Sequence, residues 1–410
     1  MTQSDALANE VVFCGLCATL ARSTPRRQCH LCRLGCVLGD SLVTVREAGE
    51  ADPEGAHEAD PLALCAPAEF VVILARAMVR KVPWLEMLYR WSQNRWGFEM
   101  PRTYVIARYA GTRPWMLASD DSVVNPVLTR FDVNDAPALF VADPFVMCVG
   151  GEWQLFFEVL RADTQLGVVA LATSADGVVW SYQGIIVDEP FHLSYPFVFA
   201  WDSEVYMIPE SLGTRSVRLY RAIAYPRQWE FVADLLAGED FADSTVFRHG
   251  GRWWMFTETG ARSETGERVG WHDVLRLFFA DELKGPWTEH PMSPVVDGDS
   301  RVARMAGRVL EHEGRLVRFG QDCSSVYGRQ VFAFEIVELS PHRYEERAIT
   351  EQPVVGPGRD GWNAGGMHHI DAVFIDGAWV AYVDGWRWSR VPHPFLRRLL
   401  RAPGRGASAR

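Results

Sequence analysis

Short apolar segments separated by tight polar turns recur five times between residues 139 and 390. Each copy opens with an apolar segment, and a turn leads from it into a second apolar segment. Glycine beside an acidic, histidine or second glycine residue occupies these turns and favours hairpins, because such residues tolerate positive φ. The turns are 150–152, 249–251, 313–314 and 376–377. A third strand and an edge strand follow, so the pattern predicts a four-stranded antiparallel unit.

The five copies are spaced like the blades of a β-propeller. Equivalent positions are 52, 48, 63 and 63 residues apart, at Asp143, Tyr195, Asp243, Ala306 and His369. One four-stranded blade per interval predicts an all-β, five-bladed β-propeller. An open β-sandwich is the alternative, but sandwich strands do not usually repeat one hairpin five times.

The chain outside the propeller divides into an N-terminal extension and a tail. Residues 1–66 hold six of the eight cysteines, and residues 67–135 form a mixed α+β lead-in to the propeller at 136–390. The fifth copy lacks outer strands, and we expect Thr103–Tyr109 to complete the last blade. Residues 391–410 are expected to be a flexible basic tail.

Composition limits function without changing this fold. The chain is 48% hydrophobic and has a net charge of −11, which disfavours a nucleic-acid-binding body because such surfaces are basic. No segment reaches the roughly 18 apolar residues that a membrane helix needs. The first ten residues do not resemble a signal peptide. We therefore expect a cytoplasmic protein with no transmembrane segment and no nucleic-acid partner.

Two CxxC pairs lie near the start of the chain, at Cys14, Cys17, Cys29 and Cys32. Four thiolates at this spacing are typical of a structural zinc site in a reducing compartment. The alternative is a short segment that neither folds nor binds metal. We expect the propeller itself to require no cofactor. The segment 395–401 is expected to be solvated rather than bound to a membrane.

Polar residues replace apolar ones where the inner strand of each copy begins. In a propeller these positions converge on the central axis, so we expect them to form one pocket. They are Asp143, Ser194, Tyr195, Asp243, Arg304, Arg308, His368, His369 and Asp371. The ends of the second strands add one carboxylate in every copy, namely Glu158, Glu210, Glu258, Asp322 and Asp384.

Carboxylates gathered at a narrow axis need a physical reason, because buried like charges repel one another and lose their hydration. A polar ligand, a metal ion or paired acid–base chemistry would supply one. Each acid taken singly has a structural alternative. An Asp at a blade start can cap backbone N–H groups, and an acid at a strand end can lie in solvent.

Several longer segments resemble a known family. They are ADPF at 142–145, PFHLSYPFVF at 190–199, YMIPES at 206–211, VRLYRA at 217–222, FRHGGRWWMFTET at 247–259 and GWNAGGMHH at 361–369. They look like the N-terminal domain of plant glucosamine inositolphosphorylceramide transferases and its free-standing bacterial relatives, over about residues 120–390. That domain is similar to the five-bladed propeller hydrolases of the arabinanase and xylosidase type. The resemblance implies a carbohydrate-related role beside machinery that builds glycans or glycolipids.

The resemblance also implies roles for axial residues. The hydrolase propellers use one Asp as general base, a second Asp that orients and tunes pKa, and a Glu as general acid. By position these roles would fall to Asp143 as base and Asp243 as the orienting residue. Blade four carries Arg304 and Arg308 where the acid usually lies. We therefore assign the acid to Glu210, whose pKa its apolar strand is expected to raise.

The arginines suggest an anionic ligand. Arginine forks and imidazoles suit a phosphate or carboxylate, as in a phosphorylated sugar or a nucleotide sugar. The four side chains concerned are Arg304, Arg308, His368 and His369. The alternative is that Arg308 pairs with Asp322 or Asp243 and only neutralises the axis.

Two functions follow from these observations. The first is an enzyme that hydrolyses or transfers a glycoside. Further ligand contacts would then come from Ser194, Tyr195, Glu258, Asp371, Trp362 and Trp386, and Trp254 could also stack on a sugar face. Packing between blades is the alternative for the tryptophans. The second function is a non-catalytic module that holds a glycan or phospho-sugar for a partner glycosyltransferase.

Overall fold

The computed structural model of the chain describes residues 98–99, 102–261, 269–388 and 391–392. These residues form strands, turns and one 3-10 helix at Leu212–Thr214, with no α-helix among them. Several expectations lie outside the described residues. They are the expected zinc ligands Cys14, Cys17, Cys29 and Cys32, the part of the lead-in before residue 98, and the tail from residue 393 onward.

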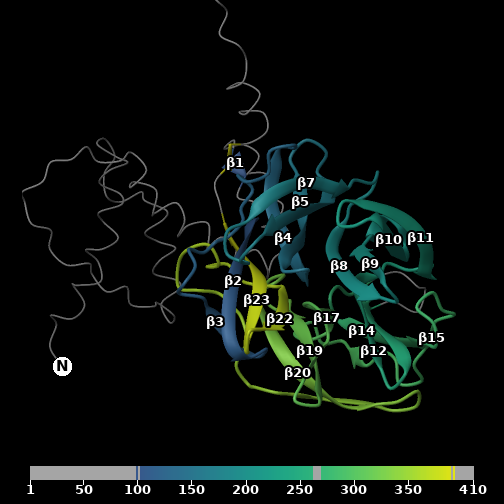
Figure 1. Cartoon of the computed structure of the whole chain (residues 1–410). Coiled ribbons are helices and arrows are strands. Elements are labelled where there is room, and N and C mark those ends of the chain that lie inside the picture. The colour runs from purple at the N-terminus through teal and green to yellow at the C-terminus, as the bar shows by residue number, and fades with distance from the viewer. Residues whose placement is uncertain (1–97, 100–101, 262–268, 389–390, 393–410) are drawn as a thin grey trace, which may run out of the picture. The chain divides into compact units, whose positions relative to one another are not determined.

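The prediction of a five-bladed β-propeller is confirmed. Five antiparallel sheets follow one another around a ring in Figure 1, with β4, β8, β17 and β22 near its centre. Blade one holds β4 (Ala138–Val149), β5 (Glu152–Arg161), β6 (Gly167–Ser174) and β7 (Ser181–Val187). Blade two holds β8 (Ser194–Trp201), β9 (Glu204–Glu210), β10 (Ser216–Ala224) and β11 (Gln228–Ala237).

Blades three and four each contain an additional short strand. Blade three holds β12 (Ala242–His249), β13 (Arg252–Glu258), β14 (Val274–Ala280), β15 (Thr288–Glu289) and β16 (Val296–Asp297). Blade four holds β17 (Arg304–Met305), β18 (Leu310–His312), β19 (Arg315–Asp322), β20 (Gln330–Leu339) and β21 (Tyr344–Ala348). In blade four, β17 and β18 both pair with β19, so together they take the place of a single inner strand.

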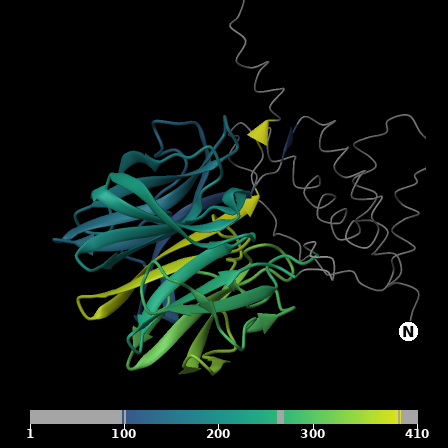
Figure 2. The ribbon, with the colours of Figure 1, turned by 90° about the vertical axis from the view of Figure 1, so that its right-hand side faces the viewer.

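The fifth blade combines strands from both ends of the repeat region. Its order is β22 (Ile370–Ile375), β23 (Ala378–Trp388), β2 (Arg102–Arg113) and β3 (Met116–Ser119). The segment Thr103–Tyr109, expected to close the ring, lies in β2 and pairs with β23. Figures 1 and 2 show the blue β2 beside the yellow β23. A separate two-stranded pair joins β1 (Phe98–Glu99) to β24 (Val391–Pro392).

The inner and middle strands are nearly continuous apolar runs because sheets cover both of their faces. In β5, every residue from Trp153 to Val159 is buried. Aromatic rings fill the spaces between blades. Phe156 of blade one contacts Trp229 of blade two, with ring centroids 5.9 Å apart. Trp254 is also a packing residue, since it is 2% exposed and its indole N–H is bonded to the His249 carbonyl.

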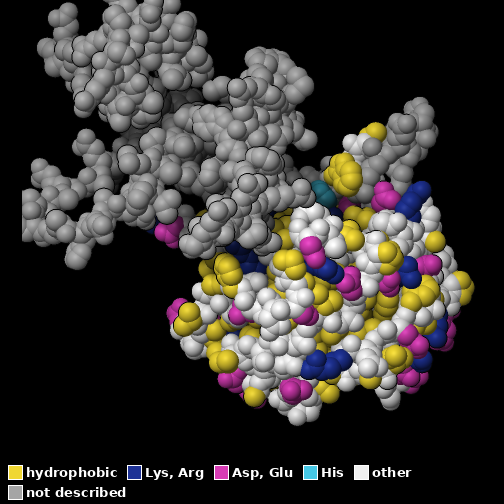
Figure 3. Space-filling view, turned by 90° about the horizontal axis from the view of Figure 1, so that it is seen from above, with side chains coloured by type: hydrophobic (Ala, Val, Ile, Leu, Met, Phe, Trp, Pro, Cys, Tyr) yellow, Lys and Arg dark blue, Asp and Glu magenta, His cyan; other side chains and the backbone are white. Residues whose placement is uncertain are grey.

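The visible face carries charged side chains of both signs. On the face shown in Figure 3, acidic and basic side chains are interspersed and neither kind forms a continuous patch. Within the described ranges, no helix combines the length and apolar character that a membrane crossing requires.

The closing strand should be part of the cooperative fold. Ile106 of β2 is fully buried between blades five and one, whereas Met116 of β3 is 55% exposed. We expect Ile106→Ala to lower the free energy of unfolding by about 2–5 kcal/mol because it leaves a cavity. Met116→Ala, the control, should change it by less than about 0.5 kcal/mol. Chemical denaturation measures both, and equal effects would show that β2 does not close the ring.

Candidate functional site

A pocket of about 180 Å³ opens at the axial end of the inner strands. Residues from blades one, two, four and five line it. They are Tyr104, Phe140, Ala142, Asp143, Glu158, Leu160, His192, Ser194, Glu210, Arg304, Tyr327 and His368. Most of these side chains are buried, while His192 is 37% exposed and therefore lies toward the mouth.

One backbone device repeats at the inner strands of the first three blades. Asp143, Tyr195 and Asp243 have φ values of 52°, 45° and 48°, and the strand register shifts at each of them. A carboxylate of the preceding blade accepts the N–H of each residue. Asp384 accepts from Asp143 at 3.0 Å, Asp143 from Tyr195 at 3.0 Å, and Glu210 from Asp243 at 3.2 Å. The structural role of an axial acid, capping a backbone N–H, therefore applies to one oxygen of Asp143.

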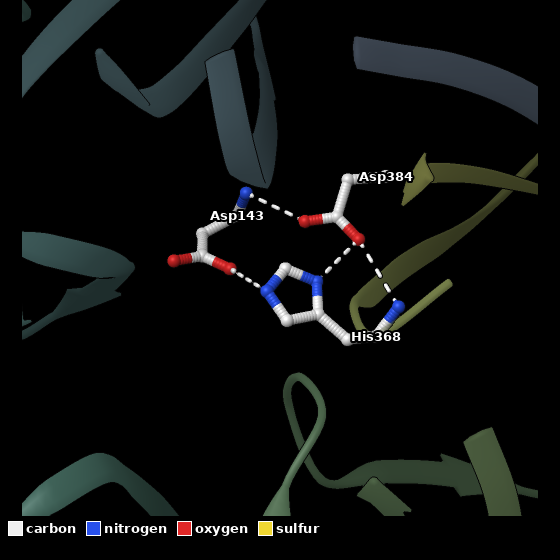
Figure 4. A group of neighbouring side chains, drawn as sticks. All are labelled: Asp143, His368 and Asp384. Carbon is white, nitrogen blue, oxygen red and sulfur yellow. Dashed lines mark hydrogen bonds and ion pairs between the residues drawn. The ribbon is translucent and has the colours of Figure 1, made fainter. Parts of the chain in front are cut away.

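Asp384 holds His368 in a defined orientation against Asp143 (Figure 4). One oxygen of Asp384 accepts the backbone N–H groups of His368 and His369 and lies 2.6 Å from Nδ1 of His368. Nε2 of His368 faces Oδ1 of Asp143 at 3.6 Å. With Nδ1–H donated to Asp384, the proton of a charged imidazole lies on Nε2 and points toward Asp143.

The pKa values of these three groups follow from burial and from each other's charge. Burial disfavours every charged form, yet His368 lowers the pKa of Asp384, and Asp384 raises the pKa of His368. Burial raises the pKa of Asp143 to about 6, against the opposing charge of His368. Asp143 therefore titrates near neutral pH, where an acid–base catalyst is most useful.

The same three residues could approach a metal ion, with one ligand atom from each lying within 4.8 Å of the others. Both oxygens of Asp384 already accept hydrogen bonds, however. A cation would find only Oδ1 of Asp143 and Nε2 of His368 without a hydrogen bond. Two such ligands favour acid–base chemistry over a resident metal.

Arg304 is enclosed by carboxylates from two other blades. Its Nε and Nη2 donate to Asp243 at 2.6 and 3.1 Å, and Nη2 also donates to Glu210 at 2.8 Å. Burial opposes ionisation of Glu210, but the charge of Arg304 and the hydrogen bonds from Asp243 together outweigh it and lower the Glu210 pKa. The expected rise in the Glu210 pKa is therefore wrong in direction. Contacts from blades three and four outweigh the effect of its apolar strand.

Glu158 is the pocket carboxyl whose pKa is raised most clearly. It is 5% exposed on β5, and burial together with the nearby charges of Asp143 and Glu210 raises its pKa well above the usual range. Its Oε1 lies 3.4 Å from Nε2 of His192. Nδ1 of His192 accepts the N–H of Gly167 at 2.9 Å, so Nε2 carries the proton of the neutral ring.

The structure brings together only part of the predicted site. Asp143, Ser194, Glu210, Arg304 and His368 line the pocket. Asp243 and Glu258 lie behind Arg304, with Glu258 Oε2 at 3.6 Å from Nη1.

The predicted anion site does not form. Arg308 pairs with Asp371 through two contacts of 2.6 and 3.0 Å, not with Asp322 or Asp243. Nε2 of His369 bonds the Pro144 carbonyl at 2.9 Å, and burial lowers its pKa to about 4. Only Arg304 and His368 of the four proposed donors reach the pocket, and both are engaged by carboxylates.

Three predicted ligand contacts are packing residues instead. The Tyr195 hydroxyl is 2.7 Å from that of Thr245, beneath the pocket. Trp386 is 1% exposed, and its indole N–H donates to the Gly328 carbonyl at 2.9 Å. Trp362 packs against the backbone of Gly385, where an added Cβ would lie 2.3 Å from the indole ring.

Several lining residues were not predicted. They are Tyr104, Phe140, Leu160, His192 and Tyr327. Tyr104 lies on the closing strand opposite Trp386, so the expected β2–β23 pairing carried a signal for it. Tyr327 comes from the β19–β20 connection, and the repeat pattern carries no signal for it.

Known proteins are similar to this chain over most of the propeller. Residues 116–386 match the family described as glucosamine inositolphosphorylceramide transferase 1, N-terminal. The transferase of that name from Oryza sativa subsp. japonica is 38% identical over 278 residues, which is 66% of this chain and 36% of the relative. That from Arabidopsis thaliana is 34% identical over 271 residues, 65% of this chain and 35% of the relative. The chain thus spans about a third of the length of these curated relatives.

Solved structures with a related shape are more distant in sequence. A glycosyl hydrolase from Bacteroides ovatus has a TM-score of 0.47 at 12% identity, over 66% of this chain and 95% of that one. An α-L-arabinanase from Cellvibrio cellulosa, complexed with arabinohexaose, has a TM-score of 0.42 at 13% identity, over 61% and 96%.

Removal of the Asp384 carboxylate should destabilise the propeller. Asp384→Ala leaves three backbone N–H groups and the His368 imidazole without their acceptor, and such a loss typically costs about 3–5 kcal/mol. Glu345→Ala, at an exposed carboxylate of β21, is the control and should change stability by less than about 0.5 kcal/mol. Denaturant unfolding measures both variants. A loss below about 1 kcal/mol for Asp384→Ala would contradict the proposed role.

Proposed function

This chain belongs to the family of glucosamine inositolphosphorylceramide transferase 1, N-terminal, and on that premise we propose that its axial pocket binds one sugar unit and acts on the glycosidic bond of that sugar. One observation supports the proposal most directly. A single buried pocket holds two carboxyl groups, Asp143 and Glu158, whose surroundings give them different pKa values. Such separated pairs are typical of acid–base catalysis.

The size of the pocket suits one sugar ring. Its volume of about 180 Å³ equals roughly six water molecules at about 30 Å³ each. That space accommodates a monosaccharide unit rather than several linked sugars. The lining also suits a sugar, since Tyr104 and Phe140 offer ring faces while carboxylates and Ser194 offer hydrogen bonds to hydroxyl groups.

The two carboxyl groups would have complementary roles. Glu158, whose raised pKa favours its protonated form, would donate its proton to the glycosidic oxygen as the bond to the anomeric carbon breaks. Asp143, ionised above pH 6, would accept a proton from the water or sugar hydroxyl that attacks that carbon. The proposed acid thus moves from Glu210 to Glu158, because Arg304 keeps Glu210 ionised.

His368 would act as a positioning residue for the base. Its charge favours the ionised form of Asp143, and Asp384 fixes its orientation. Glu210 and Asp243 would hold Arg304 at the pocket wall, where its remaining surface can contact the ligand.

A non-catalytic sugar-binding module is the second candidate. The curated relatives are named as transferases, and this chain covers only about a third of their length. In addition, Asp143, Glu210 and Asp384 each accept a backbone N–H from a neighbouring blade, which is a structural task. The module would present the bound sugar to a separate glycosyltransferase.

Neutralising either carboxyl separates the two candidates. With a panel of aryl glycosides and free sugars, we expect Asp143→Asn and Glu158→Gln to retain sugar binding but lose about 10²–10⁴-fold in kcat, as is usual for a general acid or base. Calorimetry measures the binding, and release of the aryl group measures turnover. Glu345→Gln on the outer strand serves as control. Binding without turnover by the unaltered protein would favour the module.

The pH profile tests the role of His368. Activity should fall as pH drops through the Asp143 pKa of about 6, because the base is then protonated. Replacing His368 by Gln removes a cation that lowers this pKa, so the acid limb should move to higher pH by about one unit. His312→Gln, at a remote partly buried histidine, should leave the limb in place. A limb that moves to lower pH in His368→Gln would refute the assignment.

A further inference from the structure

Arg102 differs from the other cations near the pocket in lacking an acidic partner. Arg304 is held by Asp243 and Glu210, and His368 by Asp384. Within the described part of the chain, Arg102 forms no ion pair with any carboxylate. Its Nη1 lies 3.4 Å from the Tyr327 carbonyl, which is long for a hydrogen bond, and its side chain also acts on the Tyr104 hydroxyl.

Aromatic rings support the Arg102 guanidinium at the edge of the pocket. The guanidinium carbon lies 5.6 Å from the centroid of Tyr327, 4.8 Å from that of Trp386 and 5.5 Å from that of Trp388. This stacking fixes the plane of the guanidinium and, among the described residues, leaves most of its N–H donors without an acceptor. A partly exposed, oriented arginine of this kind is suited to bidentate recognition of an oxyanion.

Two neighbours connect Arg102 to the pocket itself. Tyr327, on which it stacks, lines the pocket, and so does Tyr104. Arg102 and Tyr104 are two residues apart on β2 and therefore lie on the same face of the strand. The Tyr104 hydroxyl is buried, and the charge of Arg102 acts on it.

The interior of the pocket repels anions. Asp143, Glu158 and Glu210 line it, and Arg304 is already shared between two carboxylates. A negatively charged substituent would therefore stay at the mouth while the neutral ring of the same ligand enters. Arg102 is the donor that such a substituent would meet there.

We infer that Arg102 makes the site selective for sugars that carry an oxyanion, a phosphate or a carboxylate, with the ring in the axial pocket and the oxyanion on Arg102. This inference rests on the proposed function, since it requires a sugar in the pocket.

Matched sugar pairs test the inference. Titration calorimetry at low salt would compare glucose, galactose and myo-inositol with their monophosphates, and glucose with glucuronic acid. Where a pair binds, we expect the anionic sugar to bind about tenfold or more tightly than its neutral partner, because its oxyanion accepts charge-assisted hydrogen bonds. High salt should reduce this ratio. Phosphates and glucuronic acid tested side by side show which oxyanion the site takes.

Variants of Arg102 test whether this residue sets the ratio of anionic to neutral affinity. Arg102→Gln should reduce the ratio of anionic to neutral affinity by about tenfold, and Arg102→Lys should reduce it less because it keeps the charge but loses the fork. Arg113→Gln removes an arginine from the same strand that also stacks on a ring, that of Trp115, and should keep the ratio. Thermal unfolding of each variant shows that it is folded.

The outcomes separate the two proposals. If sugars bind but the ratio of anionic to neutral affinity is the same in the unaltered protein and in Arg102→Gln, this inference is overturned and the proposed function is not. A ratio near one in the unaltered protein would do the same. Failure of every neutral and anionic sugar to bind would reject the proposed function and this inference with it.

Discussion

A ring of polar contacts around the axis ties all five blades together. Asp384 of blade five accepts the N–H of Asp143, and Asp143 accepts that of Tyr195 in blade two. The ring continues from Glu210 to the N–H of Asp243, and from Asp243 to Arg304 in blade four. Arg308 of blade four then returns to Asp371 of blade five. Because each contact crosses a blade boundary, the carboxylates that resemble a catalytic cluster also set the spacing of the blades.

The ring explains why buried carboxylates are tolerated at a narrow axis. Burial of a charge is costly unless hydrogen bonds and an opposite charge replace its hydration. Asp371 and Asp384 meet this condition, with backbone N–H groups and a cation each. Glu158 does not, because its Oε1 faces the ring of His192 and no cation, and its pKa is accordingly raised well above the usual range. Structural demand and chemical reactivity are thus divided among residues that occupy equivalent repeat positions.

The sequence predicted the propeller and much of the axial set, because both depend on local patterns. Repeated hairpins identify blades, and the missing outer strands of the fifth copy pointed to Thr103–Tyr109. Ion pairs between blades could not be predicted in this way. Arg304 meets Glu210 from 94 residues away and Arg308 meets Asp371 from 63 residues away, and no pattern within a repeat specifies such contacts. Because these contacts could not be predicted, the expected direction of the Glu210 pKa shift was wrong and the expected anion site does not form.

The closing strand β2 contributes to the wall of the pocket as well as to the fold. β2 completes the fifth sheet, and its alternation places Arg102 and Tyr104 on the face that borders the pocket. The family match covers residues 116–386, so the pocket combines residues of the matched region with Tyr104 from outside it. An axis that must keep its carboxylates for blade contacts has little freedom to change ligand. A strand added at the edge has more, because its side chains reach the mouth without entering the ring of contacts. In this chain, a change of ligand is therefore easier at the closing strand than at the axis.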